Sequence, residues 1–331
     1  QIVLGASVGE AVLGKKVGNK AILWGAIAGT IPDLDVFLRF FTDEITATEM
    51  HRGFSHSILF ALLFAPILGW LVEKGSKKKL ATRKDWSWLF FWSLVTHPLL
   101  DANTTWGTQL FWPFEYRVAY KNIFVADPLY TVPFLILVII VMFYKRNNPK
   151  RAKINRWALI ISSSYLLLTF VLKSAAHYRF SEALDEQKIE YVEMDSQPSP
   201  LNTILWNAQV ETPTGMFSGS YSFFDKQPIH FHKEIAKGHA LLTPYLHNKQ
   251  VQQIIKIAAG WYFVEECDDG LLFTDIRFGQ FGFKEDSPYT WQYSIKKNPD
   301  GKIDVKRIDF SPGDVNFKET FGQLVRRIKG N

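Results

Sequence analysis

The sequence predicts a multi-span α-helical membrane domain followed by a soluble α+β domain that lies outside the cytoplasm. Two observations carry this prediction: strongly apolar segments recur early in the chain, and strand-like alternation replaces them later. The average composition of the chain is consistent with this prediction, because 47% of the 331 residues are hydrophobic while the mean hydropathy is close to zero. Such a balance is typical of a chain with one apolar and one polar part. We therefore expect a membrane domain over residues 1–177 and a soluble domain over residues 178–331.

Five apolar segments in the first part are candidate membrane spans. Two of them approach the roughly 20 apolar residues that cross a hydrocarbon core, and Trp and Tyr, which are typical of membrane interfaces, flank the set. A soluble helical core is the alternative, since shorter apolar runs also occur there. The first 13 residues fit a sixth helix. The five segments are residues 21–38, 56–72, 86–100, 128–144 and 157–172.

Basic residues are concentrated in the loops on one side of these spans. Lys and Arg cluster at residues 15–20, 74–84 and 145–156, whereas residues 39–55 and 101–127 are poorer in them. The positive-inside rule assigns the three basic clusters to the cytoplasm. The fifth span then exits on the other side of a bacterial-type inner membrane, which places the soluble domain outside the cytoplasm.

The later part of the chain carries strand, turn and helix signals. The runs WYFVEEC and LLFTDIRF flank a DDG turn, and NPDG separates two more strand-like runs. The stretch TPYLHNKQVQQIIKIAAG predicts an amphipathic helix with a threonine cap and a terminal glycine. Because Cys267 is the single cysteine, the sequence excludes an internal disulfide and a metal site built from several cysteines.

Three polar motifs lie at the outer ends of the expected spans. They are IPDLD at 31–35, MHRGFSHS at 50–57 and THPLLDANTTWGT at 96–108. A polar side chain buried at a membrane costs free energy unless it has a partner, so their shared depth predicts a site. Imidazoles and carboxylates are ligands of zinc and related divalent ions. The candidate metal ligands are Asp33, Asp35, His51, His56, His97 and Asp101.

The spacing of the candidates supports a metal site. His97 and Asp101 are four residues apart, so on a helix they project from one face and can share an ion. Asp33 and Asp35 would diverge on a regular helix, but Pro32 disfavours a helical conformation at the residue before it. A break at that residue would let both carboxylates turn inward. Six ligands exceed the needs of one four-coordinate ion, so we expect two divalent ions, with zinc as the first choice.

Each metal candidate also has a structural interpretation, which the sequence leaves open. Asp33 would only cap a helix, and Asp35 would orient a ligand from behind. His97 and Asp101 would form a buried hydrogen-bonded couple. These interpretations need no ion.

The remaining residues of the second motif, and one glutamate, are also open to two interpretations. His51 would be a loop histidine, and His56 an interfacial histidine that follows Ser55, a potential helix cap. Arg52 is a candidate catalytic residue because a guanidinium suits phosphate, and its alternative is an ordinary surface arginine. Glu10 is the second catalytic candidate, because it is an ionisable group in an apolar segment.

Several separated motifs together resemble the signature blocks of the YdjM-type (YdjM/YbcI-type) membrane-bound metal-dependent hydrolases. They are GTIPDLD, HRGFSHS and THPLLDANTTWGTQLFWPF, with a basic loop between the second and third, and DPLY before a long span. The resemblance covers roughly residues 1–180 and implies an integral membrane hydrolase that depends on a metal. The motifs are also faintly similar to zinc-dependent phospholipase C. Many members of the YdjM-type family have a histidine near the N-terminus, where this chain has Gln1.

Together these patterns favour a hydrolase that acts on a lipid or lipid-linked ester or phosphoester at the outer membrane interface. A divalent ion would supply hydroxide at neutral pH and polarise the scissile ester. The alternatives are a transporter, a non-enzymatic metal-binding membrane protein or a membrane-anchored interaction protein. Transport favours ligands near the midplane, whereas these motifs gather at one face. The expected partner is a lipid substrate and not a nucleic acid, and the sequence does not predict an oligomeric state.

Overall fold

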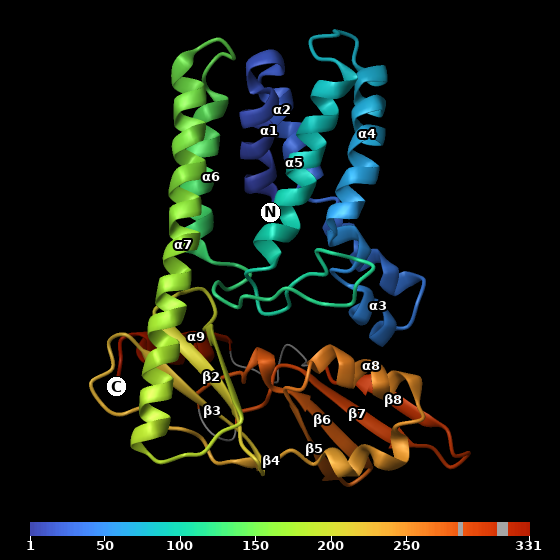
Figure 1. Ribbon diagram of the computed structural model, residues 1–331, viewed down its shortest axis with the longest axis vertical. Helices are drawn as coiled ribbons and strands as arrows, with labels where there is room; N and C mark the ends of the chain where they lie inside the picture. Colours follow the sequence, from blue (N-terminus) through green and yellow to red (C-terminus); the bar gives the residue numbers. More distant parts are fainter. Residues whose placement is uncertain (284–286, 310–316) are drawn as a thin grey trace. The chain divides into compact units, whose positions relative to one another are not determined.

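The computed structural model describes residues 1–283, 287–309 and 317–331 (Figure 1). These residues form two compact units. The first unit consists of residues 1–41, 50–170 and 200–202, and the second of residues 42–49, 171–199 and 203–331. The domain boundary that the sequence suggested falls inside helix α7 (Pro149–Glu186), which contributes residues to both units.

The first unit is a bundle of helices that opens with a tight helical hairpin. Its two helices approach closely at glycines, since a Cβ on Gly25 would lie 2.2 Å from the carbonyl oxygen of Gly5. Gly18 makes the turn between them with a φ of 62°, which glycine adopts readily. The helices of this unit are α1 (Ile2–Val17), α2 (Asn19–Ala28), α4 (Ile58–Gly75), α5 (Arg83–Asp101), α6 (Pro128–Met142) and the first part of α7.

Local capping defines where α4 and α5 begin. Thr82 and Asp85 form a reciprocal capping box at the start of α5. The hydroxyl of Ser57 accepts a hydrogen bond from the backbone of Phe60 and caps α4, so the cap is Ser57 and not Ser55. The helix α5 packs between α1 and α4 (Figure 1), which places its C-terminal end close to the start of α4.

Helices occupy all five segments that were expected to cross the membrane, but they differ in length. Within the described residues, α4 and α7 are long and apolar enough to span a bilayer. A third span is added if α2 and the following 3-10 helix η1 (Pro32–Phe40), bent by 43°, count as one. The helix α6 is apolar but has 15 residues. The structure therefore supports two to three spans where the sequence suggested five, and the other crossings stay predictions.

The chain between α2 and η1 differs from the single helix expected over residues 21–38. The helix α2 ends at Ala28, and Pro32 occupies the first turn of η1, where its missing amide hydrogen is tolerated. The interruption next to Pro32 is confirmed, but Ile31 itself keeps helical torsion angles, with φ −55° and ψ −43°. The change from α2 to a 3-10 helix separates the two aspartates of IPDLD from α2.

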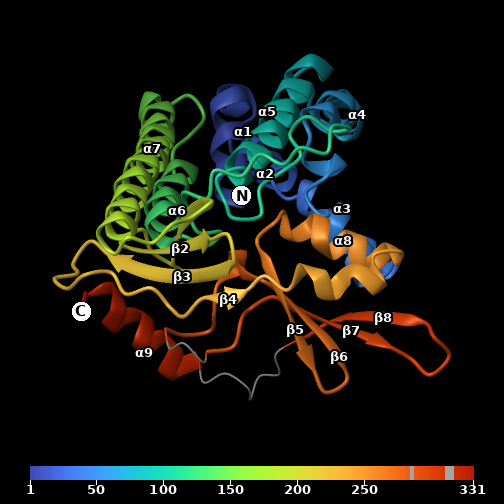
Figure 2. The ribbon, with the colours of Figure 1, turned by 60° about the horizontal axis from the view of Figure 1, so that its bottom comes forward.

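The second unit contains two four-stranded antiparallel sheets (Figure 2). Strands that follow one another in the chain pair with one another in both sheets. The hairpin around DDG is confirmed, with Cys267 opposite Gly270, and NPDG connects the last two strands as expected. The first sheet contains β1 (Glu193–Pro198), β2 (Leu205–Glu211), β3 (Gly215–Ser222) and β4 (Ile235–Ala236). The second contains β5 (Tyr262–Cys267), β6 (Gly270–Asp275), β7 (Gln292–Lys297) and β8 (Ile303–Arg307).

Helices complete the second unit. The expected amphipathic helix is α8 (Lys249–Ala258), capped by the side chain of Asn248. The expected threonine cap is wrong, because Thr243 lies in the preceding 3-10 helix. The other helices are α3 (Glu44–Met50), of which residues up to Glu49 belong to this unit, η3 (His239–Tyr245), η4 (Ile276–Phe278) and α9 (Phe317–Ile328). The chain is thus a helical N-terminal region followed by a sheet-containing C-terminal domain.

Candidate metal centre

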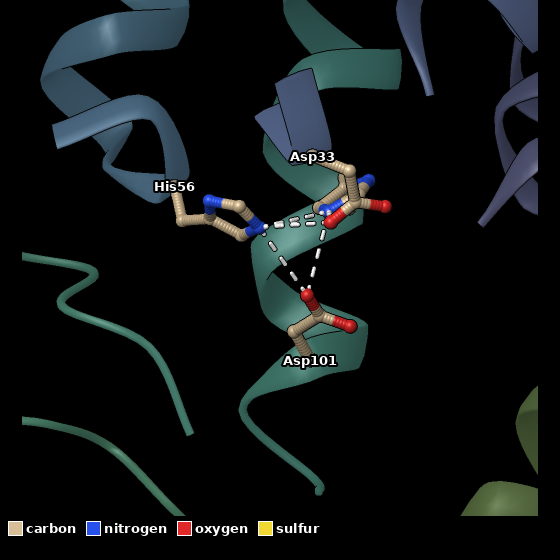
Figure 3. Close-up of side chains that lie close together, drawn as sticks. Asp33, His56 and Asp101 are labelled. Carbon is tan, nitrogen blue, oxygen red and sulfur yellow. Dashed lines mark hydrogen bonds and ion pairs between the residues drawn. The ribbon is translucent and has the colours of Figure 1, made fainter. Parts of the chain in front are cut away.

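Four of the six proposed ligands meet in the first unit. They are Asp33, His56, His97 and Asp101, and each offers one donor atom within 4.8 Å of the other three. Asp33 comes from η1, His56 from the 3-10 helix η2 (Phe54–His56), and the other two from the last turn of α5. Figure 3 shows the ring of His56 pointing toward the carboxylates of Asp33 and Asp101. Three separate segments therefore converge on one point.

The distances between the imidazole nitrogens and the carboxylate oxygens, and between the two imidazole nitrogens, suit ligands of a tetrahedral ion. His56 Nε2 lies 3.4 Å from an oxygen of Asp33 and 3.4 Å from an oxygen of Asp101. His97 Nε2 lies 3.3 Å and 3.4 Å from the same two oxygens, and the two Nε2 atoms are 3.1 Å apart. Ligands bonded to zinc at 2.0–2.1 Å with tetrahedral angles are separated by about 3.3–3.4 Å. Two imidazoles and two carboxylates at this separation are a donor set suited to one zinc-like ion.

Contacts behind the two histidine rings fix their orientation. His97 Nδ1 lies 2.7 Å from the carbonyl oxygen of Gly29, which only accepts hydrogen bonds, so Nδ1 carries a proton and, in the neutral ring, Nε2 keeps the lone pair that a metal needs. His56 Nδ1 lies 2.9 Å from the Ser55 hydroxyl and 3.3 Å from Asp35. Each ring thus presents Nε2 to the centre, the arrangement that outer partners impose on ligating histidines.

Asp35 and His51 lie behind this group and are not part of the four-atom cluster. Asp35 accepts hydrogen bonds from the Ser55 hydroxyl and the Arg52 backbone, both at 2.9 Å, and contacts His51 Nδ1 at 2.8 Å. Through these contacts the Asp35 carboxylate holds the segment that carries His56 in place. This position matches the orienting role that the sequence left open for Asp35. The gathered donors suffice for one ion, and a second ion stays a prediction.

Electrostatics at His56 reflect the carboxylates around it. Burial by itself would lower the pKa of this imidazole, but Asp101, Asp33 and Asp35 together raise its pKa to about 10. The centre thus concentrates negative charge around a buried ring. Such a concentration favours a bound cation.

Arg52 is buried against the same group and held firmly. Its Nη1 donates to the Thr104 hydroxyl at 2.7 Å, and its Nε lies 3.1 Å from Asp101. Its φ of 57° is uncommon for a non-glycine residue, and the backbone is fixed on both sides. The amide donates to Asp35, and the carbonyl accepts from Gln109.

A cavity of about 330 Å³ opens beside the metal-binding group. Asp33, Asp101 and Arg52 are part of its lining, and the side chain of Asp33 is 44% exposed. Gln1 also lines the cavity and donates through its amide to Asp101. The rest of the lining is mixed: apolar side chains come from Ile2, Leu100, Ile123, Phe124 and Val125, and polar ones from Thr30, Thr104, Asp127, Tyr130 and Thr131.

Glu10, the other catalytic candidate, lies elsewhere in the first unit. Its carboxylate accepts from Nε and Nη2 of Arg151 at 2.6 and 2.5 Å, and both side chains are buried. Arg151 also donates to Asn19 and to the carbonyl of Tyr144. The structure therefore does not bring Glu10 to the metal-binding group.

Sequence reasoning missed two partners of the centre. The Gly29 carbonyl, which orients His97, comes from a backbone atom that no side-chain pattern reveals. Ser55 was interpreted as a helix cap, although its position next to His56 was a signal that it could contact that ring. His230 and His232, two histidines on either side of Phe231 in the C-terminal domain, belong to the second unit and not to this group.

Fold and site define the class: a helical membrane protein with a buried group of side chains able to hold a metal ion. The chain belongs to the YdjM inner membrane protein family, whose model matches residues 1–176, as its motifs suggested. It is also similar to the inner membrane protein YbcI of Escherichia coli (strain K12), with 33% identity over 102 residues. That match covers 30% of this chain and 57% of the relative, so the chain spans little more than half of the relative's length. No solved structure matches the chain.

Proposed function

We propose that this inner membrane protein is a metal-dependent hydrolase that cleaves an ester or phosphoester bond of a lipid or lipid-linked substrate. The observation that carries the proposal is the position of four converging donor groups beside a cavity whose lining includes Asp33, Asp101 and several apolar side chains. A set of metal ligands alone would be equally consistent with metal storage or with a structural ion. The adjoining cavity gives a substrate a place beside it.

In this proposal Asp33, His56, His97 and Asp101 hold one divalent ion, with zinc as the first choice. When bound, such an ion lowers the pKa of water and polarises a carbonyl or phosphoryl oxygen. Asp35 and the Gly29 carbonyl keep the two imidazoles in the orientation that directs Nε2 inward. His51 contacts Asp35 and helps to hold this carboxylate in its position behind the ligands.

Arg52 is the residue that we propose to bind the substrate's anionic oxygen. Thr104 and Asp101 engage Nη1 and Nε, and Arg52 lines the cavity. These contacts use Nη1 and Nε, so the guanidinium, which has five N–H donors, keeps further N–H groups for a ligand. A guanidinium held in this way suits a phosphate or carboxylate oxygen, and it cannot ligate a cation.

The apolar side chains in the lining of the cavity support an amphiphilic substrate. Val125, shortly before α6, and Leu129, in the first turn of α6, are exposed apolar residues, and the neighbouring Phe124 lines the cavity. A headgroup at Arg52 would leave its hydrocarbon part against apolar side chains, which removes apolar surface from water. This chemistry favours a lipid or lipid-linked ester over a small polar one.

The proposal is tested on full-length protein purified in detergent. We expect about one equivalent of zinc per chain, measured by elemental analysis, and hydrolysis of at least one member of a panel of lipid headgroup esters. Removal of the metal with a chelator should abolish hydrolysis, and added Zn²⁺ should restore it. Absence of bound metal, or hydrolysis that survives complete metal removal, would overturn the proposal.

We further propose a multi-pass topology with the C-terminal domain outside the cytoplasm. Its support is the concentration of basic residues in the loops around Lys78 and Lys150. The exposed Cys267 must first be replaced by serine, because it would react with the probe. In that background Lys78→Cys and Lys150→Cys should be shielded from an impermeant thiol reagent in intact cells, while Asp300→Cys should label. The opposite pattern would invert the topology.

A further inference from the structure

A short segment between two halves of the metal site belongs to the C-terminal unit. The chain leaves the helical unit after Phe41, and residues 42–49 are part of the second unit. It returns to the helical unit at Met50, next to His51. The second unit therefore holds the stretch of chain that connects the IPDLD motif to the HRGFSHS motif.

Within the second unit, α3 is bound to α8 by polar side chains. Gln253 Nε2 donates to Glu49 at 2.7 Å and to the Thr46 hydroxyl at 3.1 Å. Lys256 Nζ lies 2.9 Å from the other oxygen of Glu49. Gln253 is 6% exposed, so its amide would be costly to bury without these partners. Lys256 is 44% exposed, and such an ion pair contributes little. Of the two α8 side chains that contact Glu49, Gln253 is therefore the stronger anchor of α3.

The helix α3 cannot keep its own shape without such an anchor. It has seven residues, fewer than the 12–15 or so at which an isolated helix becomes even marginally stable. Asp43 caps it by accepting from the Thr46 amide at 3.0 Å, and Ile45 is buried. A cap and one buried side chain are a small stabilisation, so the contacts with α8 hold the helix in place.

We propose that α8 positions the metal-site segment, residues 50–56, through α3. Glu49, the acceptor of Gln253, is two residues before His51; His51 and Arg52 then contact Asp35, and His56 is one of the four candidate ligands. The C-terminal domain then acts on the centre without contributing a ligand, and Gln253 and Glu49 are positioning residues. The proposal rests on the proposed function in one respect, because Zn²⁺ affinity is one of the two quantities that test it. The effect of α8 on the conformation of residues 50–56 can be measured without a metal.

The test compares three variants of the full chain, Gln253→Ala, Glu49→Ala and the conservative Glu49→Gln. Gln252→Ala is the matched control, because Gln252 is the same residue type one position earlier in α8, is exposed, and bonds the carbonyl of Leu246 instead of α3. Two quantities are measured: the Zn²⁺ dissociation constant, by competition with a chelator, and hydrogen–deuterium exchange of residues 50–57.

Gln253→Ala and Glu49→Ala should weaken Zn²⁺ binding by about fivefold, less than the roughly 10–100-fold that follows loss of a direct partner of a ligand. Both should also speed exchange across residues 50–57. Glu49→Gln keeps an acceptor for Gln253 and should restore most of the protection, and Gln252→Ala should change neither quantity.

Each proposal can fail separately. If the unmodified protein binds no Zn²⁺, the proposed function fails, and exchange at residues 50–57 still decides the positioning role. If Gln253→Ala and Glu49→Ala leave that exchange unchanged, the positioning role is wrong, whatever the Zn²⁺ affinity of the two variants. Faster exchange with unchanged Zn²⁺ affinity would also overturn it, because the segment would then loosen without consequence for the centre.

Discussion

The helical unit contains two buried clusters of ionisable side chains, and they are built on opposite principles. In the pair of Glu10 and Arg151, each oxygen of the carboxylate meets its own guanidinium nitrogen, and the arginine finds further acceptors in Asn19 and Tyr144. In the group around His56, two carboxylates and two imidazoles direct their donor atoms at one point. The pair of Glu10 and Arg151 is a balanced cluster, because its opposite charges and its hydrogen bonds are paired within the protein. The group around His56 is a converging cluster, because its donor atoms are directed at one point where a cation can bind.

That difference distinguishes a structural cluster from a site. A buried ion pair with all its hydrogen bonds made has nothing left for a ligand, and its energetic role is to avoid an unpaired charge. A cluster whose lone pairs converge is incomplete without a cation. Both clusters consist of ionisable residues in an apolar region, so residue type alone does not separate them.

The largest effect should follow from removing a converging ligand. His97→Ala or His56→Ala leaves at most three donors, so metal affinity should fall by more than the roughly 10–100-fold that loss of an outer partner causes. Hydrolysis should become undetectable. Elemental analysis and the lipid ester assay measure both quantities, with His230→Ala in the second unit as the control. Full metal occupancy in both variants would mean that the group around His56 is not the metal site and is structural, like the pair of Glu10 and Arg151.

Breaking the balanced cluster should affect stability instead. Arg151→Met leaves Glu10 buried without its counter-charge, which should lower the free energy of unfolding by about 3–5 kcal/mol. Adding Glu10→Leu removes the orphaned charge and should recover most of that loss. Unfolding in detergent measures stability, and Zn²⁺ affinity of the folded variants should stay unchanged. If Glu10→Leu in the double variant instead abolished hydrolysis with metal and stability intact, Glu10 would belong to the catalytic machinery after all.

A smaller effect is expected from the layer behind the ligands. Asp35→Asn replaces one acceptor oxygen by an amide donor, so contacts with His51, Ser55 or the Arg52 backbone must be lost. Metal affinity should fall by about 10–100-fold while binding remains measurable. Titration against a competing chelator gives the constant. A complete loss of metal, equal to that of His97→Ala, would move Asp35 from the orienting layer to the ligands.

The sequence predicted the residue types and the general place of the site better than its internal order. The shared position of three polar motifs at the ends of the expected spans predicted that they would meet, and Asp33, His56, His97 and Asp101, which come from the three motifs, do lie together. Which aspartate of IPDLD faces inward depends on the 3-10 geometry of η1, and a spacing of two residues cannot reveal it. The sequence therefore offered both Asp33 and Asp35 as ligands and left an orienting role open for Asp35, without deciding between them.

Long-range contacts account for most of what the sequence could not reveal. Arg151, the partner of Glu10, is 141 residues away and was counted only as a member of a basic loop. The assignment of residues 42–49 to the C-terminal unit depends on side chains of α8 more than 200 residues later. Hairpin and turn signals, by contrast, are local, and the strands around DDG and NPDG formed where they were expected.

The most selective prediction concerns Arg52, the cation beside the converging cluster. Arg52→Lys keeps the charge next to Asp101 but loses the planar fork that reaches Thr104 and the cavity together. Metal content should therefore stay unchanged, while kcat/KM for a phosphoester should fall by about tenfold, the loss of roughly one charge-assisted hydrogen bond. An uncharged carboxylic ester, which offers no anionic oxygen, should be affected less.

The exposed Arg39 on η1 provides the control for this change, since Arg39→Lys alters the same residue type outside the cavity. Parallel kinetics on the two substrates, with metal content measured for each variant, separate anion binding from metal retention. An equal loss on both substrates would mean that Arg52 acts on Asp101 and not on the substrate. Loss of metal from Arg52→Lys would lead to the same conclusion, because the guanidinium would then stabilise the converging cluster as Arg151 stabilises the balanced one.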